Sequence, residues 1–331
     1  MFTDKTILIT GGTGSFGKRF AKTVLTKHPE VKKVIIFSRD EYKQFVMEHS
    51  PEFLPDKEKL RFFIGDVRDK ERLLRAFEGV DYVVHAAALK QVPSCEYNPF
   101  EAVKTNVLGA QNVINVAMDQ GVQKVVALST DKACSPINLY GATKLCSDKL
   151  FIAGNLYVGS KPTRFSVVRY GNVAGSRGSV IPFFQKLVAE GAGELPITDL
   201  RMTRFWLKLG QAVEMVLTAL ERMHGGELYV KKIPSMRMPD LAEAVAPGLK
   251  IKEIGIRPGE KIHEQMITAE DARNTLDLGE YYIILPQIEM EYVRHSYPGA
   301  KPVAPDFEYH SGNNDSWLSV EEMRRLISEL E

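Results

Sequence analysis

Short runs of apolar, β-branched residues alternate in the first half of the chain with longer stretches in which apolar residues recur every three or four positions. The first kind of pattern predicts buried strands and the second predicts amphipathic helices. The expected strands cover residues 6–10, 33–37, 60–64, 82–84, 125–128 and 165–173. A long helix is expected from about residue 98 to residue 119. This alternation predicts an α/β fold of the Rossmann type, a doubly wound parallel sheet with helices on both faces.

The regular alternation stops after about residue 172. Beyond it we expect helices at 181–190, 210–223 and 319–330, a turn and a strand at 225–230, and a helix that opens at the basic turn of residues 257–261. We therefore predict a nucleotide-binding domain over residues 1–172. A smaller, C-terminal substrate domain would cover residues 173–331, with some segments returning to the first sheet.

Composition excludes several classes of protein. The 331 residues carry a net charge of +1, so nothing favours binding to nucleic acid or to an anionic membrane. No apolar run approaches the length of a membrane span, and the strand expected near the N-terminus leaves no room for a signal peptide. Cys95, Cys134 and Cys146 fall in no metal-ligand or paired spacing. We expect a cytoplasmic protein with free thiols and no bound metal.

Three glycines, at positions 11, 14 and 17, follow the first expected strand at the point where a helix opens near Ser15. Such glycines allow a tight turn, a close approach of the backbone to a pyrophosphate, and packing of the helix on the strand. The N-terminus of the helix then offers amide groups to the phosphates. The sequence therefore predicts a dinucleotide site, formed first by Gly11, Thr13, Gly14, Ser15, Phe16 and Gly17.

The end of the second strand bears on the choice of cofactor. Sites that prefer NAD usually place an acid there to hold the ribose 2′-hydroxyl, whereas an arginine accommodates a 2′-phosphate. Ser38 stands at this position, Arg39 follows it, and Lys43 lies one turn further on. This arrangement favours NADP over NAD. Asp40 and Glu41 leave the alternative open, because either could turn toward the ribose.

Further cofactor contacts are expected after the third and fourth strands. Asp66 either reaches the adenine amino group or caps the helix that starts near Asp69. His85 is expected to be an orienting or packing residue and not an acid-base group. The small residues after it let a cofactor lie flat against the backbone. The predicted contacts here are Asp66, Val67, Ala86 and Ala87.

Candidate catalytic groups follow the fifth strand. Ser129–Lys132 lies at its carboxyl end, where open α/β sheets place their chemistry. Tyr140 and Lys144 stand four residues apart on the next expected helix and therefore share one face. An ammonium group lowers the pKa of a nearby phenol and lets it accept a proton near neutral pH. We expect this pair to serve an oxidation.

Several motifs together resemble the extended short-chain dehydrogenases/reductases that act on nucleotide sugars. They are Thr10-Gly11-x-x-Gly14-x-x-Gly17, the pair Tyr140 and Lys144, and Arg169-Tyr170-Gly171-Asn172. Longer motifs across nearly the whole chain closely resemble the inverting UDP-N-acetylglucosamine 4,6-dehydratases of the pseudaminic-acid pathway. They include His85-Ala-Ala-Ala-Leu-Lys90, Leu128-Ser-Thr-Asp-Lys132, Met202-Thr-Arg-Phe-Trp206 and Arg257-Pro-Gly-Glu-Lys261. Thr130-Asp131-Lys132 is the most specific, because retaining dehydratases carry an Asp-Glu pair there and 4-epimerases carry neither.

This resemblance implies a reaction in which the NADP cofactor ends as it began. Sugar carbon 4 is oxidised, water is lost across carbons 5 and 6, and the hydride returns to carbon 6. Tyr140 with Lys144 would accept the 4-hydroxyl proton. Asp131 would protonate the departing 6-hydroxyl if a closed site raises its pKa, and Lys132 would move the carbon-5 proton if it is neutral. The product would be UDP-2-acetamido-2,6-dideoxy-β-L-arabino-hex-4-ulose.

The resemblance also implies the substrate contacts and the assembly. Lys90, Asn172 and Tyr170 would border the junction of cofactor and sugar, with Thr130 and Arg204 nearby. The uridine diphosphate would be held by Arg177, Gly178, Ser179, Val180, Thr198 and Arg257. Asp315 departs from the family, where an asparagine is more usual, so its contact with the substrate is in question. A homo-oligomer is expected.

Three other interpretations stay open. Two are enzymes of the same fold: a retaining nucleotide-sugar 4,6-dehydratase and a UDP-sugar 4-epimerase. The third belongs to another functional class and is an NADP-binding redox sensor that uses the same fold without turnover. The presence of Asp131, Lys132, Tyr140 and Lys144 together argues against the sensor.

Overall fold

The computed structural model describes residues 1–176, 178–288, 293 and 296–330, and its centre is a ten-stranded sheet. Seven of its strands are parallel neighbours, and every residue of the first strand is buried. In spatial order they are β3 (Leu60–Ile64), β2 (Lys33–Ser38), β1 (Thr6–Thr10), β4 (Tyr82–His85), β5 (Lys124–Thr130), β6 (Arg164–Tyr170) and β10 (Leu228–Lys231). The first six of these follow the order of a dinucleotide-binding sheet. The predicted Rossmann-type fold is confirmed.

The sheet continues past β10 in antiparallel strands from the last third of the chain. They are β15 (Tyr281–Ile284), β14 (Thr275–Asp277) and β16 (Lys301–Pro302). The strands from residues 228–302 thus extend the sheet that the first half begins.

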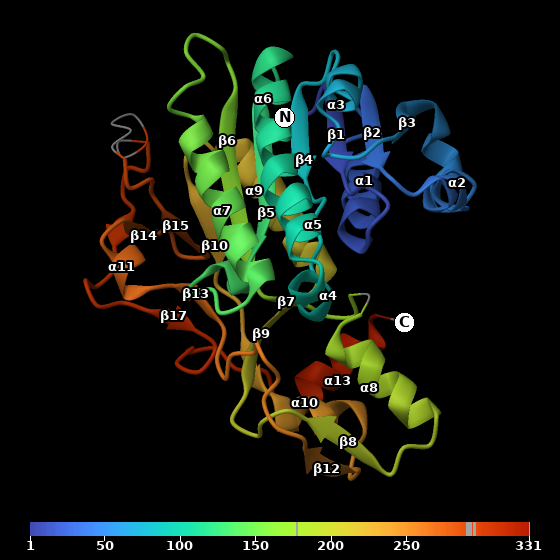
Figure 1. The fold of residues 1–331 in the computed structure, drawn as a ribbon, viewed down its shortest axis with the longest axis vertical. Coiled ribbons are helices and arrows are strands. Elements are labelled where there is room, and N and C mark those ends of the chain that lie inside the picture. The colour runs from blue at the N-terminus through green and yellow to red at the C-terminus, as the bar shows by residue number, and fades with distance from the viewer. Residues whose placement is uncertain (177, 289–292, 294–295, 331) are drawn as a thin grey trace.

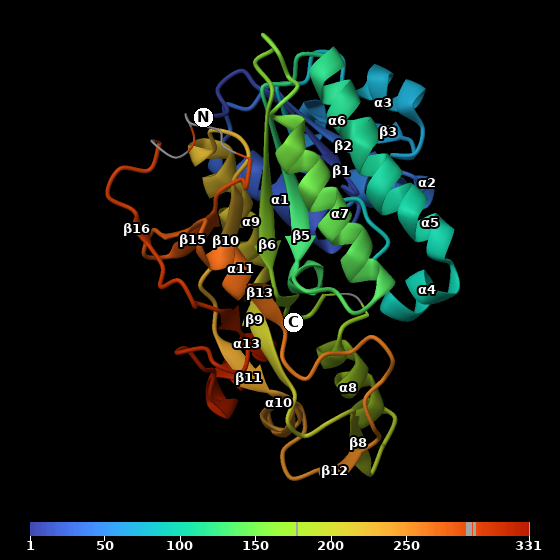
Figure 2. The ribbon, with the colours of Figure 1, turned by 60° about the vertical axis from the view of Figure 1, so that its left-hand side comes forward.

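Helices cover both faces of the sheet (Figures 1 and 2). Because side chains alternate along a strand, Ile7 and Ile36 face one helical layer, and Leu8 and Ile35 face the other. The first layer contains α1 (Ser15–Lys27) and α9 (Leu209–Arg222). The second contains α3 (Lys70–Ala76), α6 (Gly109–Asp119) and α7 (Leu139–Gly154). Outside these layers, α2 (Glu41–Glu48) follows β2 and a 3₁₀ helix, η1 (Leu54–Lys59), precedes β3.

The helix predicted over residues 98–119 is interrupted. After α4 (Val92–Tyr97) come α5 (Pro99–Val103), a π-helical segment, η2 (Lys104–Leu108), and then α6. Within η2 the buried side chain of Asn106 needs hydrogen-bond partners. It accepts from the backbone N–H of Leu89 at 2.8 Å and donates to the Leu89 carbonyl at 2.9 Å and to Oγ1 of Thr143 at 3.0 Å. The interruption therefore fixes the loop after β4 to α7.

The remaining elements form a smaller part below the large sheet in Figure 1. A three-stranded sheet contains β7 (Asn172–Val173), β9 (Thr203–Leu207) and β11 (Ser235–Arg237). Helices α8 (Val180–Ala189), α10 (Met238–Val245) and α13 (Val320–Ser328) share an apolar core with the buried Trp206. Two further pairs of strands are β8 (Glu194–Ile197) with β12 (Lys250–Glu253), and β13 (Gln265–Ile267) with β17 (Tyr309–His310).

The prediction that a helix opens at residues 257–261 is wrong. These residues form a turn in which the N–H of Glu260 donates to the carbonyl of Arg257 at 3.1 Å. Pro258 removes a donor, and Gly259 adopts a φ of +80°, which a helix does not allow. The chain then leads to β13, and the next helix is the short α11 (Ala269–Ala272).

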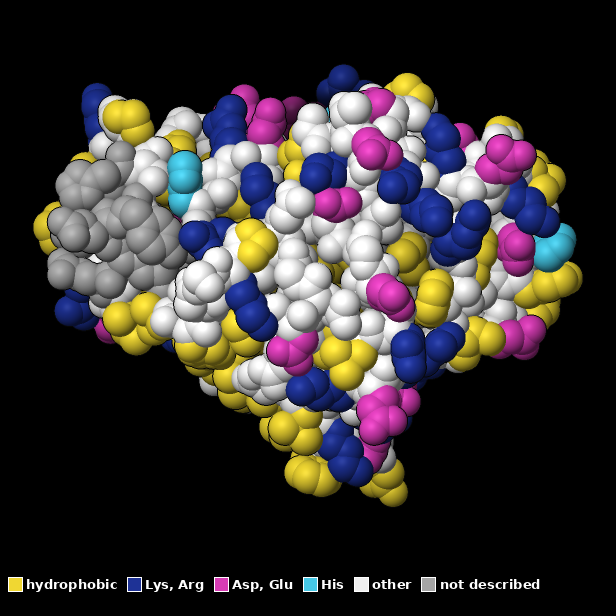
Figure 3. All heavy atoms as spheres, turned by 90° about the horizontal axis from the view of Figure 1, so that it is seen from above, with side chains coloured by type: hydrophobic (Ala, Val, Ile, Leu, Met, Phe, Trp, Pro, Cys, Tyr) yellow, Lys and Arg dark blue, Asp and Glu magenta, His cyan; other side chains and the backbone are white. Residues whose placement is uncertain are grey.

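The surface seen in Figure 3 carries positive and negative side chains interspersed with apolar ones. Within the described part of the chain, no helix combines the length and the apolar character that crossing a membrane requires.

The contact between α7 and the loop after β5 leaves no space for a side chain at Gly141. A Cβ atom at this position would lie 2.1 Å from the carbonyl oxygen of Lys132. We expect Gly141→Ala to lower the free energy of unfolding by about 2 kcal/mol or more, because backbone must move. Urea denaturation measures this change.

Gly193→Ala is the matched control, because a Cβ at Gly193 would meet no atom within 4 Å. Its effect should stay within about 0.5 kcal/mol. Equal stability of the two variants would contradict the tight packing inferred here.

Candidate active site

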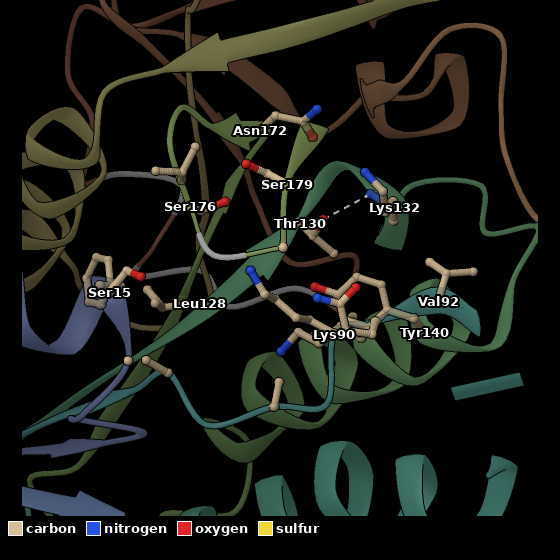
Figure 4. A pocket seen from close by; sticks show the side chains of 18 of the residues that line it. Ser15, Lys90, Val92, Leu128, Thr130, Lys132, Tyr140, Asn172, Ser176 and Ser179 are labelled. Atoms are coloured by element: carbon tan, nitrogen blue, oxygen red, sulfur yellow. Dashed lines mark hydrogen bonds between the residues drawn. The ribbon is translucent and has the colours of Figure 1, made fainter. Parts of the chain in front are cut away.

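A cavity of about 1550 Å³ lies where the parallel strands end (Figure 4). It is lined by residues after β1, β2, β4 and β5, and by residues of α7, α8 and the turn at Pro258. The predicted site residues that line it are Gly11, Thr13, Gly14, Ser15, Phe16, Gly17, Ser38, Arg39, Asp40, Lys43, Asp66, Val67, Ala86, Ala87, Lys90, Thr130, Lys132, Tyr140, Lys144, Tyr170, Asn172, Gly178, Ser179, Val180, Thr198, Arg204 and Arg257.

Three predicted site residues are not among those described as lining this cavity. Asp131 is 1% exposed and lies behind the wall. Asp315 is exposed, on the segment between β17 and α13, and is not among the lining residues, so the proposed contact with the substrate has no support. Arg177 lies outside the described residues.

One end of the cavity is built from backbone and small residues. Gly11 has a φ of +66°, and a Cβ there would lie 2.9 Å from the amide nitrogen of Ala87. A Cβ at Gly17 would lie 2.5 Å from Cα of Gly12. Gly14 is the N-cap of α1 and offers no side-chain cap, so the first amides of this helix face the cavity end without a side-chain acceptor. This donor set fits the phosphates of a dinucleotide.

Asp40, one of the two acids that could have turned toward the ribose, instead caps the N-terminus of α2. Oδ1 of Asp40 accepts from the backbone N–H of Lys43 at 2.9 Å, and the same carboxylate pairs with the Lys43 ammonium group. Glu41 is exposed and is absent from the cavity wall. Arg39 lines the wall with its side chain 54% exposed. Each of the two cations has an acidic neighbour: Lys43 pairs with Asp40, and Nη1 of Arg39 lies 3.8 Å from Oδ2 of Asp66.

Asp66 does not cap the following helix, which was one of its two predicted roles. Asp69 is the cap of α3 and accepts from the N–H of Arg72 at 2.9 Å. Asp66 instead accepts from the backbone N–H of Arg68 at 3.0 Å and from its Nε at 2.9 Å. Burial raises the pKa of Asp66, but Arg68 outweighs this effect and holds the pKa below its usual range. Asp66 is an ionised acceptor at the cavity wall.

His85 is buried at the end of β4. One ring nitrogen, Nδ1, lies 2.8 Å from Oγ1 of Thr10. Burial, with a smaller contribution from the Lys144 charge, lowers the pKa of His85 to about 3. The ring is therefore neutral and suits an orienting or packing role.

The loop at the end of β5 places three predicted residues in one hydrogen-bonded group. Thr130 donates from Oγ1 to Oδ1 of Asp131 at 2.9 Å. It also accepts from the N–H of Lys132 at 3.3 Å (Figure 4). A short 3₁₀ turn, η3 (Asp131–Ala133), follows. Nζ of Lys132 then donates to the same Oδ1 at 3.1 Å. Burial raises the pKa of Asp131, as the sequence analysis required of a proton donor.

The predicted role of Lys132 as a base requires a neutral amine, but in the structure Lys132 is charged. Burial lowers the pKa of Lys132, but the carboxylates of Asp131 and Glu264 outweigh it and hold the pKa above its usual range. Glu264 contacts Nζ at 3.1 Å. A change in this group's protonation must therefore accompany any role as a base.

Tyr140 and Lys144 lie on α7 and both line the cavity, as their spacing predicted. The predicted effect on the phenol is wrong for this structure. Burial raises the pKa of Tyr140 to about 12, because it outweighs the charge of Lys132 and a hydrogen bond with Thr130, which lower it. Burial likewise lowers the pKa of Lys144, and Asp148 partly opposes this effect.

Beneath these groups is a buried ion pair that the sequence analysis did not identify. Oδ2 of Asp148 accepts from Oγ of Ser129 at 2.6 Å and from Nη2 of Arg169 at 3.3 Å. Arg169 also donates from Nη1 to the carbonyl of Met266 at 2.8 Å. These bonds join β5, α7, β6 and β13. Asp148 stands one turn after Lys144 on α7, so the helical period could have signalled it.

Glu264 is the second residue that the sequence analysis missed. It is 2% exposed, precedes β13 and lines the cavity. Arg204 lies nearby, with Nε 3.9 Å from Oε1 of Glu264, while its Nη1 donates to the carbonyls of Thr203 and Ile262. No local pattern marks Glu264, because its partner Lys132 lies far away in the sequence.

The opposite end of the cavity carries the residues expected to hold a uridine diphosphate. Gly178 has a φ of +73°, and a Cβ there would lie 2.7 Å from Nε2 of Gln91. Arg257 is exposed at this wall. Oγ1 of Thr198 donates to the sulfur of Met202 at 3.0 Å. The wall here thus offers a cation, a hydroxyl group and close-packed backbone.

Comparisons with known proteins agree with this geometry. Residues 7–286 match the family model described as "Polysaccharide biosynthesis protein". A UDP-N-acetylglucosamine 4,6-dehydratase (inverting) of Campylobacter jejuni is 55% identical, over 100% of this chain and 99% of the relative. A UDP-glucose 4-epimerase of Rickettsia akari is 44% identical, over 100% of this chain and 97% of the relative. The X-ray structure of Pen from Bacillus thuringiensis is 40% identical and superposes over 100% of both chains with a TM-score of 0.90.

Proposed function

The chain belongs to the polysaccharide biosynthesis protein family, and from this premise we propose that it is a UDP-N-acetylglucosamine 4,6-dehydratase that inverts sugar carbon 5. The observation that carries the proposal is the hydrogen-bonded group of Thr130, Asp131 and Lys132 beside Tyr140 at one cavity. The identity of 55% to an inverting dehydratase over the whole chain supports it.

The chain's own residues supply the proton transfers. Tyr140, with Lys144 on the same helical face, takes the proton of the 4-hydroxyl as carbon 4 is oxidised. Asp131, whose burial favours the protonated form, gives a proton to the 6-hydroxyl that leaves as water. Lys132, once it has passed a proton to Asp131 across their contact of 3.1 Å, takes the proton of carbon 5 and returns one from the other face, which inverts that carbon. Asp131 lies behind the wall in the structure, so it reaches the substrate only after a local rearrangement.

The cofactor is a nicotinamide dinucleotide, which when bound accepts a hydride from carbon 4 and returns it to carbon 6. The uncapped N-terminus of α1, the close approach at Gly11 and the small residues Ala86 and Ala87 would hold it. Arg39 and Lys43 at the wall favour NADP, because a guanidinium and an ammonium group suit a 2′-phosphate.

The UDP-sugar would extend from the proton-transfer groups toward the smaller part of the molecule. Lys90, Asn172, Tyr170 and Arg204 border the junction with the cofactor. The diphosphate and uridine would be held by Gly178, Ser179, Val180, Thr198 and Arg257, and by Arg177, which lies outside the described residues. An arginine fork suits a pair of diphosphate oxygens.

We further propose a cytoplasmic homo-oligomer that acts in pseudaminic-acid biosynthesis. The resemblance of the motifs to the pathway's inverting dehydratases supports the pathway, and the near-neutral chain without paired cysteines supports the compartment.

A 4-epimerase is the second candidate, because a relative named UDP-glucose 4-epimerase is 44% identical over the whole chain. An epimerase needs the hydride transfer of Tyr140 and Lys144 but no loss of water. The placement of Asp131 against Lys132 is therefore the feature that favours the dehydratase.

The deciding experiment incubates the protein with UDP-N-acetylglucosamine in deuterated water and identifies the product by NMR. We expect a 4-keto-6-deoxy sugar that carries deuterium at carbon 5 in the inverted configuration. Retention of the gluco configuration at carbon 5 would indicate a retaining dehydratase, and a simple 4-epimer would indicate the epimerase. Either result refutes the proposal.

Lys132→Ala should slow dehydration by at least about 100-fold, because it removes the proton carrier. It should keep the cofactor bound and still oxidise carbon 4, which a rise in the absorbance of the reduced cofactor would report. Tyr140→Phe is the contrasting variant and should show no such absorbance, because the first hydride transfer is blocked. Normal turnover by Lys132→Ala would show that the role given to Lys132 is wrong.

Arg39→Ser should weaken the binding of NADP relative to NAD by about 10- to 100-fold, because a charge-assisted hydrogen bond to the 2′-phosphate is lost. The ratio of dissociation constants for the two nucleotides measures this effect. Arg75→Ser, which removes an exposed arginine at the end of α3, should leave the ratio unchanged. Wild-type protein that copurifies with NAD would contradict the preference for NADP.

A further inference from the structure

Glu264 is a buried carboxylate at the cavity wall to which the proposed proton transfers give no role. Its backbone is held firmly, since its N–H donates to Oγ of Ser311 at 3.0 Å and its carbonyl accepts from the N–H of Ser311 at 2.7 Å. The side chain therefore starts from a fixed point between β13 and the loop after β17. Its position is set by the fold.

The carboxylate of Glu264 and that of Asp131 share one cation. Nζ of Lys132 lies 3.1 Å from Oε1 of Glu264 and 3.1 Å from Oδ1 of Asp131. Within the described residues, Oε2 of Glu264 and Oδ2 of Asp131 are both buried and have no hydrogen-bond partner. Of the two acids, only Glu264 lines the cavity. The contact with Glu264 therefore holds the ammonium group of Lys132 at the surface of the cavity.

The dehydration step requires a change of charge at this lysine. Before the step, the ammonium group of Lys132 gives a proton to Asp131 across their contact of 3.1 Å, which leaves a neutral amine and a protonated acid. The C–H bond at carbon 5 then breaks, its proton goes to the Lys132 amine, and the electron pair forms the double bond between carbons 5 and 6. The bond from carbon 6 to oxygen breaks, and the hydroxyl leaves as water with the proton of Asp131. Lys132 becomes an ammonium group and Asp131 becomes a carboxylate, so positive charge grows on Nζ during the step.

We propose that Glu264 is a positioning residue for this step: it holds Nζ of Lys132 beside Asp131 and stabilises the positive charge that Lys132 gains from the carbon-5 proton. The inference rests on the proposed function. A base that becomes charged reacts faster when a fixed acceptor orients it and balances its charge. Glu264 meets both requirements through one contact of 3.1 Å.

The charged and titratable groups around Glu264 come from three places. They are Asp131 and Lys132 of η3, Arg204 of β9, and Lys261 of the turn before β13. Burial raises the pKa of Glu264, but Lys132 and Arg204 outweigh it and keep the pKa below its usual range, so Glu264 is ionised. Its negative charge raises the pKa of both Asp131 and Lys132.

The negative charge of Glu264 shifts the pH dependence of activity in a definite direction. Asp131 and Lys132 titrate as a coupled pair whose apparent pKa values limit activity on the acid and the alkaline side. Removing the negative charge of Glu264 lowers both values, so the whole pH profile moves toward lower pH. A residue that only supports the fold would not move the profile.

The test compares E264Q with wild type in the holoenzyme, by kcat and KM for UDP-N-acetylglucosamine over the pH range in which both stay folded. We expect kcat to fall by at least about 10-fold, KM to change by less than about twofold, and the acid limb of the kcat profile to move down by about one pH unit. The matched control is E308Q, which removes an exposed carboxylate beside β17 and should leave all three quantities unchanged.

Three results overturn the inference: an unchanged kcat, a change in KM alone, and a lower kcat with an unmoved acid limb. E264D provides a second readout if E264Q fails to fold. It keeps the charge, so the acid limb should stay near that of wild type while kcat falls, and a limb displaced to lower pH in E264D contradicts the proposal.

The failure of this inference is distinct from failure of the proposed function. The wild-type product in deuterated water is identified first. If it is not inverted at carbon 5, the proposed function fails and this inference fails with it. If it is inverted, the variants at Glu264 decide the inference alone.

Discussion

The candidate site depends on one ammonium group held between two buried carboxylates. Asp131 and Glu264 come from segments far apart in the sequence, and the Nζ atom of Lys132 contacts both at 3.1 Å. A buried acid is costly unless it is paired and hydrogen-bonded. The two carboxylates therefore require the lysine between them, and this requirement ties the loop after β5 to the strand β13. The same contacts make Lys132 charged, so its protonation and the position of the loop are linked.

A second buried network supports the first from below. Asp148 of α7 and Arg169 of β6 form an ion pair that also reaches Ser129 and the backbone of Met266. Asn106 ties the loop after β4 to α7 in the same way. Proton transfer needs groups fixed to within a fraction of an ångström. Buried hydrogen bonds in a packed core provide that rigidity at the side where Tyr140 and Lys144 stand.

The nucleotide end of the cavity is shaped by backbone and not by buried charged side chains. Backbone amides and missing side chains shape it, at Gly11 and at the first turn of α1. Such a cradle suits any dinucleotide of this fold, which agrees with a chain similar to both a dehydratase and an epimerase. In the proposed function, the bound cofactor would supply the hydride chemistry, and the groups after β5 would decide whether the oxidised sugar then loses water.

The sequence by itself determined the parallel strands of the first half, the glycine cradle and the common face of Tyr140 and Lys144, because these depend on neighbours within a few residues. It could not foresee the π-helical segment at Asn106, since a buried polar side chain there finds its partners on other elements. Nor could it foresee Glu264, whose partner is distant in the sequence. Only the tertiary structure decided the charge of Lys132 and the raised pKa of Tyr140. Burial and long-range charge set these values, and both arise only when remote segments pack together.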